Sequence, residues 1–158
     1  MAALDGDLGW TLGVVFRAYL KATDAVMTGM PGGHRGYQVL TAAVSDEAPS
    51  QSALCERLGI DRTVMTYLLD DLERAGLVVR RPAPTDRRTR TIVATGQGRE
   101  LLARLTERLG HAEHHILAAL PDEDRATLKA LLTRLATQAN ATDPLPDTCA
   151  VVEDIRSR

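Results

Sequence analysis

The sequence is poor in aromatic residues and in cysteine. Aromatic side chains make up 3% of the 158 residues, and the two cysteines are Cys55 and Cys149. A core with so few rings must be built from Leu, Val and Ala, a mixture that favours helices over strands. Two cysteines are too few for the disulfide framework of a small secreted domain. These shortages favour a helical protein held together by aliphatic packing.

Long apolar runs are missing as well. No stretch approaches the roughly 18 apolar residues of a membrane-spanning helix, and Met1–Asp5 carries no basic residue of the kind that opens a secretory signal. We therefore expect no membrane partner and a cytoplasmic location. The sequence also lacks a phosphate-binding glycine loop, a nucleophile elbow and an HExxH motif. We predict that the protein is not an enzyme and needs no cofactor.

The chain has no net positive charge, but its basic side chains are concentrated in the middle of the sequence. The net charge is −2, yet residues 57–104 hold ten basic and six acidic side chains and carry +4. Salt limits the range of surface electrostatics to about 8–10 Å, so a local basic surface can attract a phosphate backbone whatever the net charge. This distribution favours double-stranded DNA as a partner.

Apolar residues at three- and four-residue steps predict a mainly helical chain. The first two helices are expected over residues 8–30 and 34–45. Two short helices then flank Gly59, one over residues 51–58 and one over residues 61–76. A tight glycine turn between two short helices is typical of a helix-turn-helix. In the second short helix we expect one apolar stripe to face the core: Val64, Leu68, Leu69 and Leu72.

After residue 76 the pattern changes to a short β-hairpin. Leu77–Val79 and Thr91–Ala94 are rich in β-branched residues and predict two strands. The segment Arg80–Arg90 between them holds five arginines and one acid, Asp86. A hairpin with a long basic tip, placed after a helix-turn-helix, is typical of the wing of a winged helix.

Long helices are expected at both ends of the chain. Thr95 can cap a long helical region that Pro121 interrupts. End helices cannot bury their apolar stripes on a small winged domain, so we expect them to pair with a second copy of the chain. The fold class is mainly α with a small β-hairpin wing. The predicted divisions are a helical dimerisation region of residues 1–30 and 100–140, a winged helix-turn-helix DNA-binding domain of residues 31–99, and a flexible tail of residues 141–158.

The candidate DNA-binding residues lie at two helix starts and on the wing. The second helix of a helix-turn-helix enters the major groove, so side chains near its start meet base edges. Small polar side chains at the start of the preceding helix suit phosphate oxygens, and a hairpin arginine can enter a narrow minor groove. In that order, the candidates are Arg62, Thr63, Thr66 and Tyr67; Ser50, Gln51 and Ser52; and Arg87, Arg88 and Arg90. Asp86 is expected to orient Arg88.

Three segments within residues 51–98 carry a family signature. They are Leu54-Cys55-Glu56-Arg57-Leu58-Gly59-Ile60-Asp61-Arg62, then Leu68 to Val78, then Asp86-Arg87-Arg88 followed by Ile92, Ala94 and Thr95-Gly96-Gln97-Gly98. They resemble the multiple-antibiotic-resistance-regulator (MarR) family. The resemblance implies a ligand-responsive repressor that binds a near-palindromic operator as a homodimer, with Arg88 in the minor groove and Asp86 as its partner. Tyr67 and Asp71 stand where the family often has basic residues.

The resemblance also implies a small aromatic or anionic effector bound between the dimer helices and the DNA-binding part. The candidate ligand-binding residues are Trp10, Arg17, Tyr19, His34 and Tyr37. The aromatic members of this set serve equally well as core or dimer contacts.

Two further groups of residues have a chemical and a structural interpretation. His111 and His115 lie four residues apart, with His114 between them, a spacing that can hold a metal ion. Only two of the three share a helix face, so a surface position is the simpler interpretation and no metal site is predicted. Cys55 is expected to be a small buried side chain rather than a redox sensor.

One alternative function stays open at this point. A winged helix can bind another protein without strong DNA binding, and the acidic chain ends together with Tyr67 and Asp71 favour that interpretation. Salt dependence separates the two functions, because binding through phosphates weakens steeply as salt rises.

Overall fold

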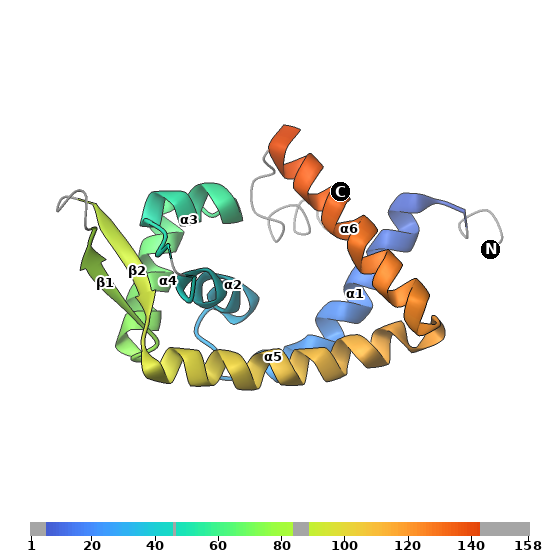
Figure 1. Ribbon diagram of the computed structural model, residues 1–158, viewed down its shortest axis with the longest axis horizontal. Helices are drawn as coiled ribbons and strands as arrows, with labels where there is room; N and C mark the ends of the chain where they lie inside the picture. The colour runs from blue at the N-terminus through green and yellow to red at the C-terminus, as the bar shows by residue number, and fades with distance from the viewer. Residues whose placement is uncertain (1–5, 46, 84–88, 143–158) are drawn as a thin grey trace.

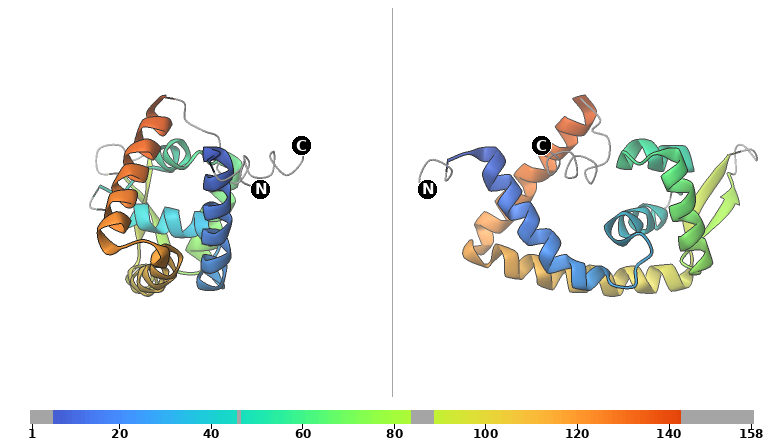
Figure 2. Two further views of the ribbon diagram at one scale, coloured as in Figure 1. Left: turned by 90° about the vertical axis from the view of Figure 1, so that its right-hand side faces the viewer. Right: turned by 180° about the vertical axis from the view of Figure 1, so that it is seen from behind.

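The computed structural model describes residues 6–45, 47–83 and 89–142. One long helix, α5 (Gly96–Ile116), runs along the molecule and carries the other elements (Figure 1). One end of α5 holds α2 (Gly33–Ala43), α3 (Gln51–Leu58), α4 (Arg62–Arg74) and the hairpin of β1 (Val78–Pro82) and β2 (Arg90–Ala94). At the other end stand α1 (Leu8–Met27) and α6 (Asp122–Thr142), and the short 3-10 turn η1 (Leu117–Ala119) joins α5 to α6. The view from behind in Figure 2 shows the same division.

Side-chain caps set the beginnings of several helices. Ser50 accepts a hydrogen bond from the backbone N–H of Ala53, Asp61 from those of Thr63 and Val64, and Thr95 from that of Gly98. These bonds satisfy N–H groups that have no partner within the helix. The predicted starts of α3, α4 and α5 are therefore confirmed.

A glycine turn joins α3 to α4. Gly59 adopts a left-handed conformation with φ of 63°, which a residue without a Cβ adopts at little cost. The N–H of Ile60 then reaches back to the carbonyl of Cys55, and the Ile60 side chain enters the core. The predicted helix-turn-helix is present, with its turn at the expected residue.

The core is one continuous aliphatic cluster under the helix-turn-helix. Its fully buried large members are Leu40, Leu54, Met65, Leu69, Leu72, Ile92, Val39 and Val78. Leu105 and Leu109 of α5 and Val26 and Met27 of α1 belong to the same cluster. The helix α5 is continuous across residue 99, where the sequence suggested the end of the winged domain, and its residues Leu105 and Leu109 extend the same core beyond that point.

The hairpin is longer than the sequence indicated. β1 and β2 pair antiparallel from Val78 opposite Ala94 to Pro82 opposite Arg90. The predicted first strand ended at Val79, so Arg80 and Arg81 belong to a strand rather than to the tip. The N–H of Ile92 donates to the carbonyl of Pro49, and this bond ties the hairpin to the segment just before α3. No helix in the described ranges is long and apolar enough to cross a bilayer.

Candidate DNA-binding surface and apolar groove

The helix α4 presents a polar face to solvent. Met65, Leu68, Leu69 and Leu72 face the core, at the i, i+3, i+4 and i+7 positions of one helix side. Arg62, Thr63, Thr66 and Tyr67 are all exposed. The four candidates for base contacts thus share the accessible part of α4. Val64, expected in the core stripe, is instead 43% exposed, because Met65 occupies that place in the core.

One of these candidates already uses its hydroxyl proton. The Thr66 hydroxyl donates to the carbonyl of Arg62 at 2.9 Å and accepts from Nε2 of Gln51 at 2.8 Å. The backbone N–H of Thr63 donates to Oδ1 of Asp61 at 2.7 Å, which leaves the Thr63 side chain on the exposed face. Both threonines can still accept hydrogen bonds or offer their methyl groups. Gln51 has a structural role that the sequence did not reveal, since its bond to Thr66 fastens the start of α3 to α4.

Asp61 holds the start of α4 in place. The backbone N–H groups of Thr63 and Val64 lower the pKa of its carboxyl group, which keeps the cap ionised. A negative charge there also suits the positive end of the helix dipole. The adjacent Arg62 forms no ion pair within the part of the chain that the structure describes, so its guanidinium is available to a ligand.

The start of α3 lies beside α4. Ser50 uses its side-chain oxygen as the helix cap, at 3.1 Å from the N–H of Ala53, and is half-buried. Ser52 is exposed. Ser50, Gln51 and Ser52 are therefore gathered at one helix start, as expected, although two of them already hold the local structure together.

The hairpin contributes exposed arginines at its outer end. Arg90 begins β2 and Arg81 lies on β1, and both are exposed. Asp86, Arg87 and Arg88 lie outside the described residues, so their pairing and their minor-groove role stay predictions. Arg81 was not among the sequence candidates, which took only Arg87, Arg88 and Arg90 from the segment Arg80–Arg90.

Arg80 faces inward and joins the hairpin to α4. Its guanidinium lies 2.6 Å from Oδ1 of Asp70 and 2.6 Å from Oε2 of Glu73, and its backbone N–H donates to Oε1 of Glu73. The side chain is 21% exposed. The N–H and guanidinium of Arg80 lower the pKa of Glu73. The three-residue spacing places Asp70 and Glu73 on one face of the helix, which could have indicated a shared basic partner. The sequence did not show that this partner is Arg80.

Part of the predicted ligand-binding set comes together where α1, α2 and α5 meet. Nε2 of His34 lies 3.1 Å from the hydroxyl of Thr23, and its ring is 6.1 Å from that of Tyr19, centroid to centroid. The Tyr37 hydroxyl lies 3.5 Å from that of Thr106. Burial, followed by the charge of Glu113 and by Tyr37, raises the pKa of Tyr19.

Trp10 stands apart from this group. It is exposed and lies nine residues before Tyr19 on α1, about 14 Å along the helix axis. Arg17 is exposed too. The structure thus gathers Tyr19, His34 and Tyr37 and leaves Trp10 at the far end of its helix.

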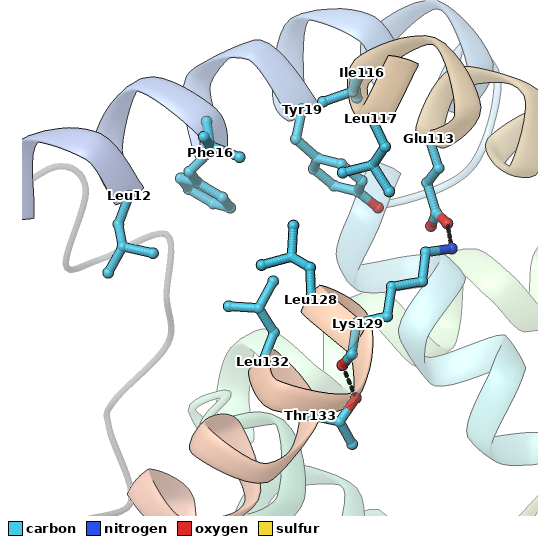
Figure 3. A pocket seen from close by; sticks show the side chains of 11 residues that line it. Leu12, Phe16, Tyr19, Glu113, Ile116, Leu117, Leu128, Lys129, Leu132 and Thr133 are labelled. Carbon is cyan, nitrogen blue, oxygen red and sulfur yellow. Dashed lines mark hydrogen bonds and ion pairs between the residues drawn. The ribbon is translucent and has the colours of Figure 1, made fainter. Parts of the chain in front are cut away.

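An apolar groove opens between α1, the end of α5 and α6 (Figure 3). Its volume is about 500 Å³. Its walls are mostly aliphatic and aromatic, and the ion pair of Lys129 with Glu113 lies at its edge. In and beside the groove, α1 and α6 expose eight large apolar side chains: Leu8, Trp10, Leu12, Val15, Phe16, Leu131, Leu132 and Leu135. The end helices therefore carry the unpartnered apolar face that the sequence predicted.

The histidine and cysteine candidates show no gathered site. His111, His114 and His115 are exposed, and Nδ1 of His114 lies 3.2 Å from the guanidinium of Arg125. Among the described residues, no three His, Cys, Asp or Glu side chains are placed to hold a metal ion. Burial raises the pKa of the Cys55 thiol, which disfavours the reactive thiolate.

Comparison with known proteins identifies the family. Residues 37–89 match the model of the MarR family. The chain is also 31% identical over 147 residues to the putative transcriptional regulatory protein for the hcr operon of Thauera aromatica, covering 89% of this chain and 85% of that protein. This chain belongs to the MarR family.

Solved structures agree with the assignment. CouR from Rhodococcus jostii RHA1 bound to p-coumaroyl-CoA matches with a TM-score of 0.71 and 29% identity over 90% of this chain and 96% of that one. The transcriptional repressor CouR bound to a 23-mer DNA duplex matches with a TM-score of 0.69 and 28% identity, covering 84% and 94%. The mainly helical winged-helix fold is confirmed, and this MarR-family protein is a DNA-binding transcriptional regulator.

Proposed function

We propose that this MarR-family regulator is a repressor that binds a near-palindromic operator as a homodimer and is released by a small aromatic or anionic effector. The observation that carries the DNA-binding part is the exposed face of α4. Arg62 and Tyr67 offer accessible donors there, and the bond from Gln51 to Thr66 holds α3 at a fixed position beside them. The solved CouR–DNA complex supports the role of repressor.

The hairpin completes this DNA-binding surface. Arg81 and Arg90 are exposed on it, and neither forms an ion pair among the described residues. Free guanidinium groups next to the recognition helix suit phosphate oxygens or the minor groove. Arg88, supported by Asp86, is proposed as the minor-groove residue because of the family wing pattern.

The apolar face of α1 and α6 supports the homodimer. The groove of about 500 Å³ and the eight large apolar side chains exposed in and beside it form an apolar surface of the kind that marks a protein interface. A second copy related by a two-fold axis covers the same face on both chains. Such a dimer places two recognition helices about 34 Å apart, one turn of DNA, and therefore reads a near-palindrome.

The group formed by Tyr19, His34 and Tyr37 supports an effector site. It joins a helix of the proposed dimer region to α2 of the winged domain, so a ligand bound there contacts both parts. CouR, which is similar in sequence and fold, was solved with p-coumaroyl-CoA. Aromatic rings and a histidine suit a phenolic or carboxylate compound of this general kind.

Fluorescence anisotropy tests the DNA-binding part. The duplex is the region upstream of the protein's own gene, compared with a scrambled duplex, at several salt concentrations. We expect selective binding that weakens steeply with salt. Arg62→Ala should weaken it by roughly 5- to 150-fold, the range for one base contact, and Arg88→Ala should weaken it as well. Arg134→Ala on α6 is the matched control and should bind like the wild type.

The same measurement tests the one rival function. Exposed Tyr67 and the acid Asp71 on α4 favour a protein-binding winged helix. If the wild type binds both duplexes equally weakly and Arg62→Ala changes nothing, the operator model is wrong and the protein-binding function takes its place.

Calorimetry with salicylate tests the effector site. We expect binding below millimolar concentration that is lost in His34→Ala, because the ligand sits against the imidazole. His111→Ala removes an exposed histidine elsewhere and should leave binding intact. Absence of heat at millimolar salicylate with the wild type would contradict this class of effector.

A further inference from the structure

The recognition helix carries a small apolar patch on its exposed face. Val64 is 43% exposed and Tyr67 is 67% exposed, and residues three apart on a helix are surface neighbours. We call these two residues the Val64–Tyr67 patch. In the described part of the chain, the other exposed large apolar side chains lie on α1 and α6, at the far end of α5. The patch is therefore separate from the proposed dimer face.

The polar groups around the patch are partly engaged within the protein. The hydroxyl proton of Thr66 is donated to the carbonyl of Arg62. Asp71 lies 2.6 Å from the guanidinium of Arg74 and is neutralised by it. Arg62 and the hydroxyls of Thr63 and Tyr67 are the donors that remain along this face. The exposed apolar surface of Val64 and Tyr67 adds an apolar contact to these few polar ones.

We infer that the Val64–Tyr67 patch reads thymine through its 5-methyl group in the major groove. The inference rests on the proposed function, in which α4 enters that groove. The thymine methyl is the apolar group that the major-groove edge of a base pair presents, and it distinguishes thymine from cytosine and from the purines. The operator half-site therefore contains at least one thymine opposite the patch.

A protein partner fits the same patch less well. Stable protein interfaces bury more than about 1,000 Å² around a desolvated centre, and two partly exposed side chains supply only a small part of that area. Arg62 precedes Val64 by two residues on α4 and forms no ion pair among the described residues. Positive charge beside a small apolar contact matches nucleic acid, in which phosphates surround the base edges.

Uracil substitution tests the inference at the level of one methyl group. The wild-type protein first selects its preferred duplex from a random pool. Each thymine of a half-site is then replaced by uracil, which removes only the methyl group and keeps base pairing. We expect about fourfold weaker binding at one or two positions, the effect of one buried methyl. Thymines in the flanks serve as the control and should show no change.

A double-mutant cycle assigns the contact to the patch. Val64→Ser should bind the thymine and the uracil duplex equally at the position that Val64 reads, because the apolar partner is gone. Tyr67→Ser should do the same at its own position. Both side chains are exposed, so each variant should unfold within about 2 °C of the wild type.

Three outcomes overturn the inference. They are a selected half-site without thymine, uracil substitutions that never weaken binding, and serine variants that both keep full sensitivity to uracil. In these cases selective binding persists and the proposed function stands. A wild-type protein that selects no duplex at all overturns the proposed function and this inference together, so the two failures are distinguishable.

Discussion

At Gly98, the start of α5 lies in close contact with the backbone that leads into β1. The carbonyl of Leu77, at the entry to β1, would lie 2.1 Å from a Cβ at position 98, and Cδ1 of Leu40 would lie 3.1 Å away. Thr95 secures the same approach, because its hydroxyl bonds to the carbonyl of Gly76 at 2.6 Å. The Thr95-Gly96-Gln97-Gly98 pattern therefore fastens the start of α5 to the base of the wing.

Gly98→Ala is expected to destabilise the protein strongly. The added methyl meets backbone that cannot move alone, so we expect a loss of about 2–3 kcal/mol or more in the free energy of unfolding. Gly96→Ala is the matched control, since nothing lies within 4 Å of its Cβ position. That change should be neutral or stabilise the chain by up to about 1 kcal/mol. Urea unfolding followed by circular dichroism measures both, and equal effects would refute the contact.

At the level of elements, Arg80 decides how the hairpin stands against the recognition helix. Its guanidinium bonds to Asp70 and Glu73 on successive turns of α4, and also reaches the carbonyl of Thr66 at 3.4 Å. One strand residue thus contacts α4 over two turns. This contact sets the angle between the two parts that are proposed to enter adjacent DNA grooves.

Arg80→Ala and Arg81→Ala separate positioning from charge. Removal of Arg80 leaves Asp70 and Glu73 without their partner, and we expect a loss of about 1–2 kcal/mol in stability, because the carboxylates are partly exposed. DNA binding by this variant should weaken even at low salt. Arg81→Ala should unfold like the wild type and mainly reduce the salt dependence of binding. The same unfolding midpoint for both variants would contradict the positioning role of Arg80.

The stability of the same contact depends on pH through Glu73. Its pKa is lowered below the ordinary 4.5 by the N–H and then the guanidinium of Arg80. Stability from this group is therefore fully present above about pH 4.5 and is lost as pH falls through the lowered folded-state pKa. We expect Glu73→Gln to be less stable than the wild type at pH 7, with a difference that narrows below pH 4.5. A difference that is constant from pH 7 to pH 3 would refute the link.

Across the whole molecule, α5 connects the two functional ends. The Tyr37 hydroxyl lies near Thr106, and the guanidinium of Arg108 donates to the carbonyl of Ala25, so α2 and α1 are both bonded to the same helix. The Tyr19, His34 and Tyr37 group lies at this junction. A ligand that shifts α1 against α5 there would alter the distance between the two recognition helices of the proposed dimer.

Leu132→Glu is expected to break the dimer. Leu132 lines the groove, and a carboxylate there would be desolvated without a partner. We expect a monomer by light scattering after size exclusion, with operator affinity at least about 100-fold lower because two half-sites are no longer bound together. Ala130→Glu adds the same charge at an exposed position of α6 outside the groove lining and should remain dimeric. A dimeric Leu132→Glu variant would place the interface elsewhere.

Local chemistry determined much of this protein from its sequence. The starts of α3, α4 and α5 depend on Ser50, Asp61 and Thr95, each of which bonds to an N–H two or three residues ahead. The turn at Gly59 depends on one backbone conformation. Such interactions lie within a few residues of the chain, so spacing alone predicts them. The order of helices and hairpin, and with it the family, follows from these signals.

Only the tertiary structure decided which of two neighbouring residues faces the core. Val64 and Met65 both fit a helical apolar stripe, and the packing of α4 in the core buries Met65 and exposes Val64. In the sequence, Arg80 belongs to the basic segment that was assigned to the hairpin tip. In the structure, β1 pairs with β2 through Arg80, and its side chain lies beside Asp70 and Glu73. Both outcomes depend on contacts between segments distant in the chain, and periodicity carries no information about the orientation of one element against another.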